Sequence, residues 1–424
     1  MQSHDAGGES KIATTTIPIA ILCGAISVID GFDTQAIGFA AGAITKEWNL
    51  PESSAGTFFS AGYVGAIIGA VVAGYAYRLL GYRRVLCFWL CWVSAGSVLN
   101  ALAFDYVSLV SIRALCGIGL GAIIPILLAI TAEFSSESTR GRALSSVVAG
   151  SPIGGVLAGS AYGLVSIDLG WRSIFLIGAV LPLVMIPLVL AIMPRTSSEA
   201  AAAQDGSSTG DAGGKVKGAL VQTMRAVASM FTGGRAFGSI AIIIATFAGT
   251  LLALTLVSWT PLLLQGLSLS QVNSAAGGVA FNVGAMVSIF GFAIVLDRVR
   301  SGWTVPSSFA IAFLLLLVSG FLPMGVGARI ALMAMIGFFA VGPQFGIWYL
   351  ISAAYSGAER VDATAVSLIA ARIGGVLGPI AVGMLVDVGM GSGAVYGALS
   401  VVPAVASVCV VLFLLKSHLK LSGT

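Results

Sequence analysis

Long apolar runs recur along the whole chain, and short charged or turn-rich joints separate them. An α-helix needs about 20 apolar residues to cross the hydrocarbon core of a bilayer, whereas strands cross it only as a closed barrel of alternating polarity. These runs are continuously apolar and too long for such strands. Only 9% of the 424 residues carry charge, against roughly 25% in an ordinary soluble domain. The sequence therefore predicts an all-α polytopic membrane protein.

Twelve membrane spans are expected, and the first is retained because no cleavable signal peptide is evident. If the amino terminus is cytoplasmic, sixteen of the 21 Lys and Arg residues lie in inner joints, and only Lys46, Arg172 and Arg329 lie in outer ones. This asymmetry satisfies the positive-inside rule, so both termini are assigned to the cytoplasm. The expected spans are 17–43, 55–77, 85–104, 107–134, 143–166, 172–193, 236–262, 273–296, 304–323, 327–353, 363–388 and 393–416.

One long joint, residues 194–235, interrupts the series of spans. It begins with Ser, Ala, Gln, Asp and Gly and becomes basic toward its end, and the first part is typical of a flexible linker. The predicted organisation is a cytoplasmic tail of residues 1–16, a six-helix bundle of 17–193, a cytoplasmic linker of 194–235, a second six-helix bundle of 236–416 and a cytoplasmic tail of 417–424.

The two predicted bundles resemble each other in sequence. Three landmarks share nearly the same offset: Ile153-Gly-Gly-Val-Leu157 recurs as Ile373-Gly-Gly-Val-Leu377 at 220, Arg78 matches Asp297 at 219, and Arg113 matches Arg329 at 216. Transporter folds are commonly built from such internal repeats, with the substrate site where the repeats meet. We therefore expect two pseudo-symmetric six-helix bundles.

Other kinds of chemistry are not indicated. No Ser/His, metal-ligand or phosphate-loop constellation occurs outside the spans, so we expect neither an enzyme nor a cofactor or metal site. No basic arm stands apart from the membrane joints, which excludes nucleic acid as an expected partner. Five cysteines lie inside apolar runs without disulfide or zinc spacing and are interpreted as core residues: Cys23, Cys87, Cys91, Cys116 and Cys409.

Two aspartates lie near the middle of the first span, where carboxylates are costly and usually functional. Asp30 and Asp33 are three residues apart, which places them on one helical face about 5–6 Å from each other. Two like charges at that separation in a low dielectric cannot both ionise easily. One carboxyl is therefore expected to take up and release a proton during coupling. The alternative is a helix-packing or salt-bridge pair.

Arg113 is the first candidate partner for this acidic pair. Arg113 and Asp33 lie about 9 and 15 Å below the outer membrane surface if each residue rises 1.5 Å, a gap that a long side chain bridges. We predict an ion pair between them that protonation would release. A static structural ion pair is the alternative.

Arg372 lies roughly 14 Å inside span eleven and replaces Pro152 of the other repeat. A permanently charged guanidinium at that depth suits bidentate capture of a carboxylate, although it could instead pair with a neighbouring carboxylate or carbonyl. Other polar and aromatic side chains are candidates to line a substrate site, each also explicable by packing alone: Gln344, Trp348, Tyr349, Asn282 and Phe281.

Charged residues also gather at the cytoplasmic ends of the spans. Glu133, Arg140 and Arg142 follow span four, and Asp297 and Arg298 follow span eight. We expect them to form a gate network, while solvated charges that only orient the helices would look the same in sequence.

Several of these segments resemble the signature motifs of the major facilitator superfamily. They are Arg113-Ala-Leu-Cys-Gly-Ile-Gly-Leu-Gly121 in span four, Gly74 to Arg84 between spans two and three, and Asp297-Arg298. Arg78 departs from the family pattern, which has an aspartate in that joint, so the latch that the family implies there must be built differently or be weaker. The resemblance covers the whole chain and implies the two-bundle fold.

A narrower set of motifs is similar to the aromatic acid:proton symporter family. Asp30-Gly-Phe-Asp33 matches its acidic motif, and further pieces agree in order: Glu133 with Arg140 and Arg142, Gly170-Trp-Arg172, Trp259-Thr-Pro261, Arg372-Ile-Gly374 and Gly378-Pro379. The resemblance implies that Arg372 binds the substrate carboxylate. It also implies a bacterial inner-membrane protein, expected to be monomeric, whose partners are protons, the bilayer and an aromatic carboxylate.

The leading functional hypothesis is proton-coupled uptake of a hydroxybenzoate or related aromatic acid. A drug:proton antiporter is the second hypothesis, because Ser151-Pro-Ile-Gly-Gly155 loosely resembles the antiporter motif of span five. A solute sensor that binds without transport is the third. The sequence does not select among individual aromatic acids.

Overall fold

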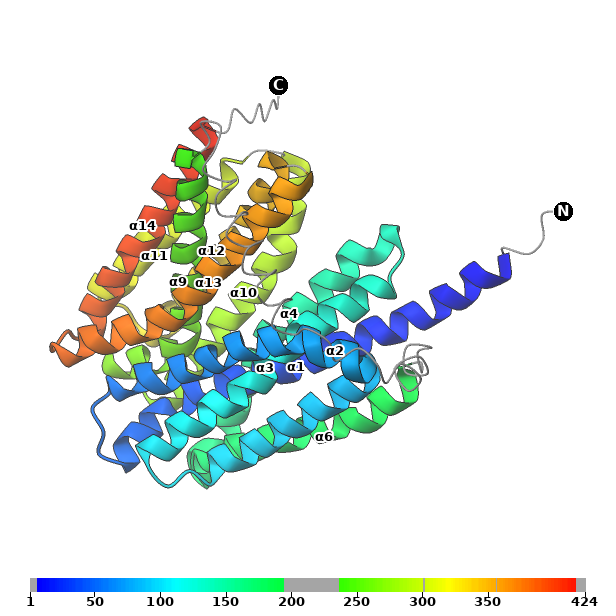
Figure 1. Ribbon diagram of the computed structural model, residues 1–424. Helices are drawn as coiled ribbons and strands as arrows, with labels where there is room; N and C mark the ends of the chain where they lie inside the picture. Colours follow the sequence, from blue (N-terminus) through cyan, green and yellow to red (C-terminus); the bar gives the residue numbers. More distant parts are fainter. Residues whose placement is uncertain (1–5, 194–235, 300–301, 356, 417–424) are drawn as a thin grey trace. The chain divides into compact units, whose positions relative to one another are not determined.

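The computed structural model describes residues 6–193, 236–299, 302–355 and 357–416, so the predicted linker 194–235 lies outside the described residues. The side chains of Arg78, Asp297 and Arg298 also lie outside them. The chain divides into two compact units: Met1–Leu50 with Thr57–Gly206 as unit 1, and Pro51–Gly56 with Ser207–Thr424 as unit 2. Each unit is described by itself below (Figure 1).

Unit 1 is a bundle of long helices in which α1 packs most extensively on α4 and also contacts α3 and α6. Its elements are α1 (Ala6–Glu47), α2 (Ser54–Ala101), α3 (Tyr106–Glu133), α4 (Glu137–Ala161), the π-helix η1 (Tyr162–Ser166), α5 (Ile167–Leu169) and α6 (Arg172–Ile192). Unit 2 pairs α10 with α12, α9 with α13 and α11 with α14. Its elements are α9 (Ala236–Gly266), α10 (Gln271–Val299), α11 (Thr304–Phe321), α12 (Val326–Ala354), α13 (Gly357–Asp387) and α14 (Ser392–Lys416).

Twelve described helical segments are long and apolar enough to cross a membrane, as the sequence predicts. Spans two and three make up the element α2, in which Gly81, with non-helical φ and ψ, separates two helices. The φ of Gly81 is 69°, a value that glycine adopts without a steric penalty. The first helix also begins at Ala6, earlier than the expected start at residue 17. The protein is therefore an all-α, multi-pass membrane protein.

Capping residues and packing explain where these helices begin and which faces they bury. At the start of α3, Asp105 Oδ1 accepts a hydrogen bond from the Ser108 N–H at 2.7 Å, and Ser108 Oγ accepts one from the Asp105 N–H at 3.1 Å. This reciprocal pair is a capping box. Large apolar side chains such as Val71 and Leu164 are 77% and 79% exposed, as expected where lipid covers the outer face of a bundle.

Close glycine contacts join the helices of unit 1. A Cβ built on Gly154 of α4 would lie 2.1 Å from the Val28 carbonyl oxygen of α1, and one on Gly31 of α1 would lie 2.2 Å from the Ser151 carbonyl oxygen of α4. Only residues without a side chain permit backbones to approach this closely. Asp33 lies two residues beyond Gly31 on α1, so this helix crossing positions it.

Unit 2 repeats the same contacts in the same register. A Cβ on Gly374 of α13 would lie 2.5 Å from the Phe247 carbonyl oxygen of α9, and both residues are offset from Gly154 and Val28 by 219–220 positions. The recurring Ile-Gly-Gly motif therefore has one structural role in both units. It lets its helix touch the first helix of the bundle, which confirms the pseudo-symmetry.

The contact register corrects one of the sequence landmarks. A Cβ on Gly117 of α3 would lie 2.2 Å from the Gly62 carbonyl oxygen, and one on Gly337 of α12 would lie 2.0 Å from that of Phe281. The offset of α3 to α12 is thus 220, and Met333, not Arg329, is the counterpart of Arg113. A shift of four residues is about one helical turn and preserves the buried face, so the sequence alone does not distinguish the two registers.

Candidate functional site

The candidate site of unit 1 is centred on Asp33, whose side chain is 1% exposed. Asp33 Oδ2 lies 3.5 Å from Arg113 Nη1, and the Arg113 side chain is 3% exposed. The structure therefore contains the ion pair that the depth argument predicts. Two buried charges are stable together because each offsets the desolvation of the other, and removing one leaves the other uncompensated.

This ion pair is loose. A charge-assisted N–H···O hydrogen bond measures about 2.7–2.9 Å, and the Arg113–Asp33 contact, at 3.5 Å, is longer than that. The Nε and Nη1 atoms of Arg113 are buried and donate no hydrogen bond to the described residues. Buried donors are nearly always bonded, so this guanidinium retains capacity for another acceptor.

Two further side chains contact Asp33, and sequence reasoning missed both. Ser97 Oγ of α2 donates a hydrogen bond to Asp33 Oδ1, and Cys116 Sγ of α3 donates to Asp33 Oδ2 at 3.5 Å. Cys116 belongs to the apolar core, as its position in an apolar run predicts. No sequence signal separates Ser97 from other serines in apolar helices, because a helical serine can also bond to its own backbone.

Two glycines of neighbouring helices pack beside these side chains. A Cβ on Gly62 of α2 would lie 3.4 Å from Arg113 Nη2, and one on Gly178 of α6 would lie 3.6 Å from Asp33 Oδ1. Asp30, one turn before Asp33, is 8% exposed. Both aspartates of the predicted acidic pair are therefore buried.

The predicted lining residues of unit 2 lie on α10 and α12. Gln344 Nε2 donates to Thr250 Oγ1 at 2.9 Å, while Gln344 Oε1 is buried and accepts no hydrogen bond from the described residues. Asn282 Nδ2 donates to the Gly278 carbonyl of its own helix at 3.0 Å. Phe281 is 1% exposed and its backbone carbonyl packs against Gly337. Gln344 is thus the one of these three with an open acceptor.

The other predicted binding residues are half-buried. Trp348 and Tyr349 pack beside an apolar core cluster of unit 2 that includes Phe309 and Ile347. Arg372 lies on α13 and is half-buried. It belongs to unit 2, whereas Asp33 and Arg113 belong to unit 1.

The predicted gate residues are exposed where they are described. Tyr77 Oη donates to Glu133 Oε2 at 3.2 Å. Arg140 and Arg142 are exposed on the first turns of α4, and among the described residues no ion pair joins either of them to Glu133. The side chains of Asp297 and Arg298 lie outside the described residues, so the gate network stays a prediction.

A second polar cluster lies at the predicted outer end of unit 1. Arg172 Nη1 donates to Glu47 Oε1 at 2.7 Å, and the Trp171 indole donates to Glu47 Oε2 at 2.6 Å. The Arg172 guanidinium also lies 4.3 Å from the Trp171 ring centroid and donates to the Ala103 carbonyl at 3.4 Å. These bonds join the end of α1 to the start of α6.

Two motif pieces of unit 2 contact each other. The Trp259 indole of α9 donates to the Pro379 carbonyl of α13 at 3.2 Å, and Trp259 is fully buried. A Cβ on Gly378 would lie 2.1 Å from Thr255 Oγ1. The Trp-Thr-Pro and Gly-Pro motifs therefore hold α9 against α13.

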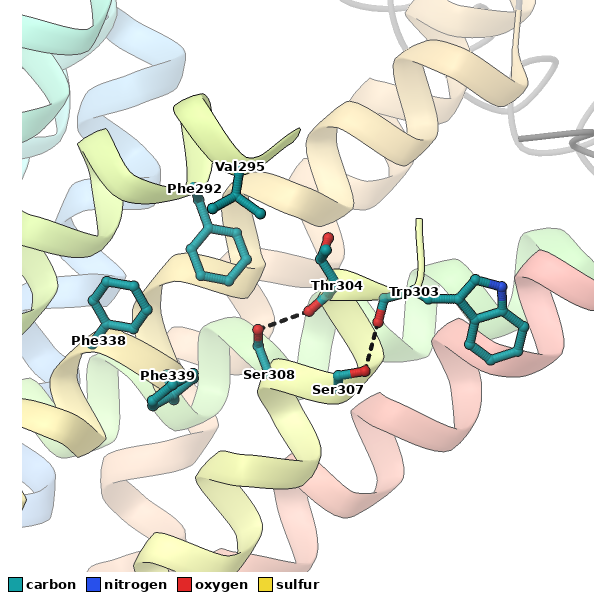
Figure 2. Close-up of a pocket in the computed structure, with 8 residues that line it drawn as sticks. All are labelled: Phe292, Val295, Trp303, Thr304, Ser307, Ser308, Phe338 and Phe339. Carbon is teal, nitrogen blue, oxygen red and sulfur yellow. Dashed lines mark hydrogen bonds between the residues drawn. The ribbon is translucent and has the colours of Figure 1, made fainter. Parts of the chain in front are cut away.

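A pocket of about 400 Å³ lies between α10, α11 and α12. Figure 2 shows its rings, Phe292, Phe338 and Phe339, around one side, with Thr304, Ser307 and Ser308 of α11 opposite. Ser307 Oγ and Ser308 Oγ donate to the carbonyls of Trp303 and Thr304 at 2.8 and 2.7 Å. The pocket contains none of the predicted site residues and offers mainly apolar surface.

Comparisons with known proteins agree with this architecture. The chain is 28% identical over 405 residues to a 3-(3-hydroxy-phenyl)propionate transporter of Escherichia coli (strain K12), covering 94% of this chain and 93% of that protein. It is 27% identical over 422 residues to a gallate transporter of Pseudomonas putida, covering 96% and 93%. A structure of the xylose transporter of E. coli matches with a TM-score of 0.68 at 17% identity, covering 93% of this chain and 95% of that one.

The model of the Major Facilitator Superfamily matches residues 23–379, most of the chain. This match, the duplicated bundles and the named relatives identify a transporter and not an enzyme. The chain belongs to the Major Facilitator Superfamily.

Proposed function

We propose that this transporter takes up an aromatic carboxylate together with a proton, by alternating access of its two halves. The names of the relatives support the substrate class, because two proteins similar over more than nine tenths of this chain transport a hydroxyphenylpropionate and gallate. Both substrates combine a phenyl ring with a carboxylate. The same relatives and the positive-inside pattern support our further proposal of a bacterial inner membrane with cytoplasmic termini.

The observation that carries the coupling proposal is the loose Asp33–Arg113 pair. Its charges balance while Asp33 is ionised, and they do not balance once Asp33 is protonated. Arg113 then remains a buried cation whose Nε and Nη1 donate no hydrogen bond to any described residue, a state that is strongly unfavourable. A substrate carboxylate restores the balance and supplies acceptors for a planar guanidinium.

Symport follows from this balance. The empty carrier has a neutral Asp33–Arg113 pair, and the loaded carrier has a protonated Asp33 with an Arg113–carboxylate pair. Either half-loaded state exposes an uncompensated charge to a low dielectric. The two neutral states are therefore the ones that reorient across the membrane, and proton and substrate move together.

The remaining predicted residues receive roles within this scheme. Arg372 supplies a second cation for the carboxylate, and Gln344 offers its open acceptor to a ring hydroxyl. Trp348, Tyr349, Asn282 and Phe281 shape the surroundings of the ring. Glu133, Arg140, Arg142, Asp297 and Arg298 control access from the cytoplasm.

The test is uptake of labelled 4-hydroxybenzoate into proteoliposomes under an imposed pH gradient, acid outside. We expect the gradient to accelerate uptake and Asp33→Asn to abolish that acceleration. Asp105→Asn is the matched control, because Asp105 is an exposed cap at the start of α3 and its change leaves coupling intact. Uptake that ignores the gradient, or a fully coupled Asp33→Asn protein, would refute the proposal.

A further inference from the structure

Two uncharged side chains contact Asp33, and the role assigned to them here rests on the proposed role of Asp33 in proton coupling. We propose that Ser97 is a positioning residue that orients the Asp33 carboxyl and, with Cys116, sets the pH at which it takes up the transported proton. Ser97 lies outside the sequence motifs, Cys116 lies within the Arg113–Gly121 motif, and both side chains are fully buried.

The two carboxyl oxygens of Asp33 have different partners. Oδ1 accepts the hydrogen bond from Ser97 Oγ, while Oδ2 lies 3.5 Å from both Arg113 Nη1 and Cys116 Sγ. The two oxygens are bonded to Cγ at a fixed angle and rotate together about the Cβ–Cγ bond. A donor that holds Oδ1 in place therefore also restricts where Oδ2 points. Ser97 thereby directs Oδ2 toward Arg113.

Charged and titratable side chains of the described part of the chain lie on several elements of unit 1. Helix α3 contributes Arg113 and Cys116, and α1 itself contributes Asp30 one turn away. Tyr162 of η1 stacks on Phe39, farther along α1, at a ring separation of 6.4 Å. On α6, Arg172 bonds to Glu47 at the end of α1. Among the described residues, α2 presents the uncharged Ser97 to this carboxyl.

Ser97 suits both protonation states of Asp33. A hydroxyl donates one hydrogen bond and accepts others, so it donates to the ionised carboxylate and can accept from the protonated acid. A hydrogen bond to a charged acceptor is stronger than one to a neutral group. Ser97 therefore favours the ionised form, and its loss makes proton uptake easier. The Cys116 thiol acts in the same direction but weakly, because S–H is a poor donor.

The test is the pH at which gradient-independent exchange of 4-hydroxybenzoate is half-maximal. Ser97→Ala should raise this midpoint by about one pH unit, equivalent to 1.36 kcal/mol, and Ser97→Thr should restore it. Ser94→Ala is the matched control: Ser94 lies one turn earlier on α2, is buried, and donates to the Ala179 carbonyl at 2.7 Å. It should leave the midpoint unchanged.

Cys116→Ser provides an independent test with the opposite sign. A hydroxyl is a stronger donor than a thiol, so this change should lower the midpoint. The inference would be overturned if Ser97→Ala, Ser94→Ala and the unmodified protein had equal pH midpoints. It would also be overturned if Ser97→Ala and Cys116→Ser shifted the midpoint in the same direction.

The two proposals fail in different ways. If Asp33→Asn remains coupled, the proposed function fails, and an infrared titration of the Asp33 carboxyl in Ser97→Ala against Ser94→Ala still tests the positioning role. If Asp33→Asn is uncoupled but neither the transport midpoint nor the infrared titration moves in Ser97→Ala, only the positioning inference fails.

Discussion

Substitution of Gly31 by alanine tests whether the α1–α4 contact positions the site. The added Cβ would lie 2.2 Å from the Ser151 carbonyl oxygen, whereas ordinary contacts begin at 3.4 Å. The obstacle is backbone, so α1 and α4 must separate locally by about 1 Å, and overpacking of this kind typically costs about 1–3 kcal/mol. Asp33 lies two residues away and moves with the helix.

We expect Gly31→Ala to lower the rate of uptake by more than its loss of thermal stability accounts for. If the overpacking cost falls on the functional arrangement, 1–3 kcal/mol corresponds to a roughly 5- to 150-fold lower rate. Uptake per reconstituted protein and the midpoint of thermal unfolding in detergent measure the two effects separately. Gly24→Ala on the same helix is the control, because its Cβ would lie 3.7 Å from the Ser146 carbonyl oxygen. Equal uptake by the two variants would refute the argument.

Three smaller effects follow from other contacts. Arg172→Lys should lower thermal stability by less than about 1 kcal/mol, because the side chains of the Arg172–Glu47 pair are 40% and 42% exposed. The stability difference should shrink in high salt, and a salt-independent loss would argue against an electrostatic contribution. The Ser108 backbone N–H holds the pKa of Asp105 below its ordinary value, so the cap stabilises α3 fully above about pH 4 and loses this effect as the pH falls through the lowered pKa. The stability difference between the unmodified protein and Asp105→Ala should therefore shrink as the pH falls through this lowered pKa, and a constant difference would contradict the cap. Arg372→Lys should raise the KM for 4-hydroxybenzoate at least tenfold by losing bidentate capture; an unchanged KM would remove Arg372 from the site.

Much of the fold was predictable because the bilayer imposes length and polarity on every span. Twelve helices, their approximate limits and the duplication all follow from apolar runs, charge placement and repeated motifs. The Asp33–Arg113 pair was also predictable, since depth along a helix is a linear function of residue number. The joint between spans two and three was predictable as well, and the structure places its break at Gly81, whose φ and ψ are non-helical.

Apolar runs and the placement of charges are enough to indicate which segments are buried in the membrane and which charged side chains share a depth. They do not determine how helices distant in sequence meet. Ser97 is one of several serines in apolar runs, and only the packing of α2 against α1 distinguishes its hydroxyl from the others. The register of the repeat was likewise settled by backbone contacts at Gly117 and Gly337. Side-chain periodicity repeats with every turn, so it constrains the face of a helix but not its axial position; the close approach of two backbones constrains both.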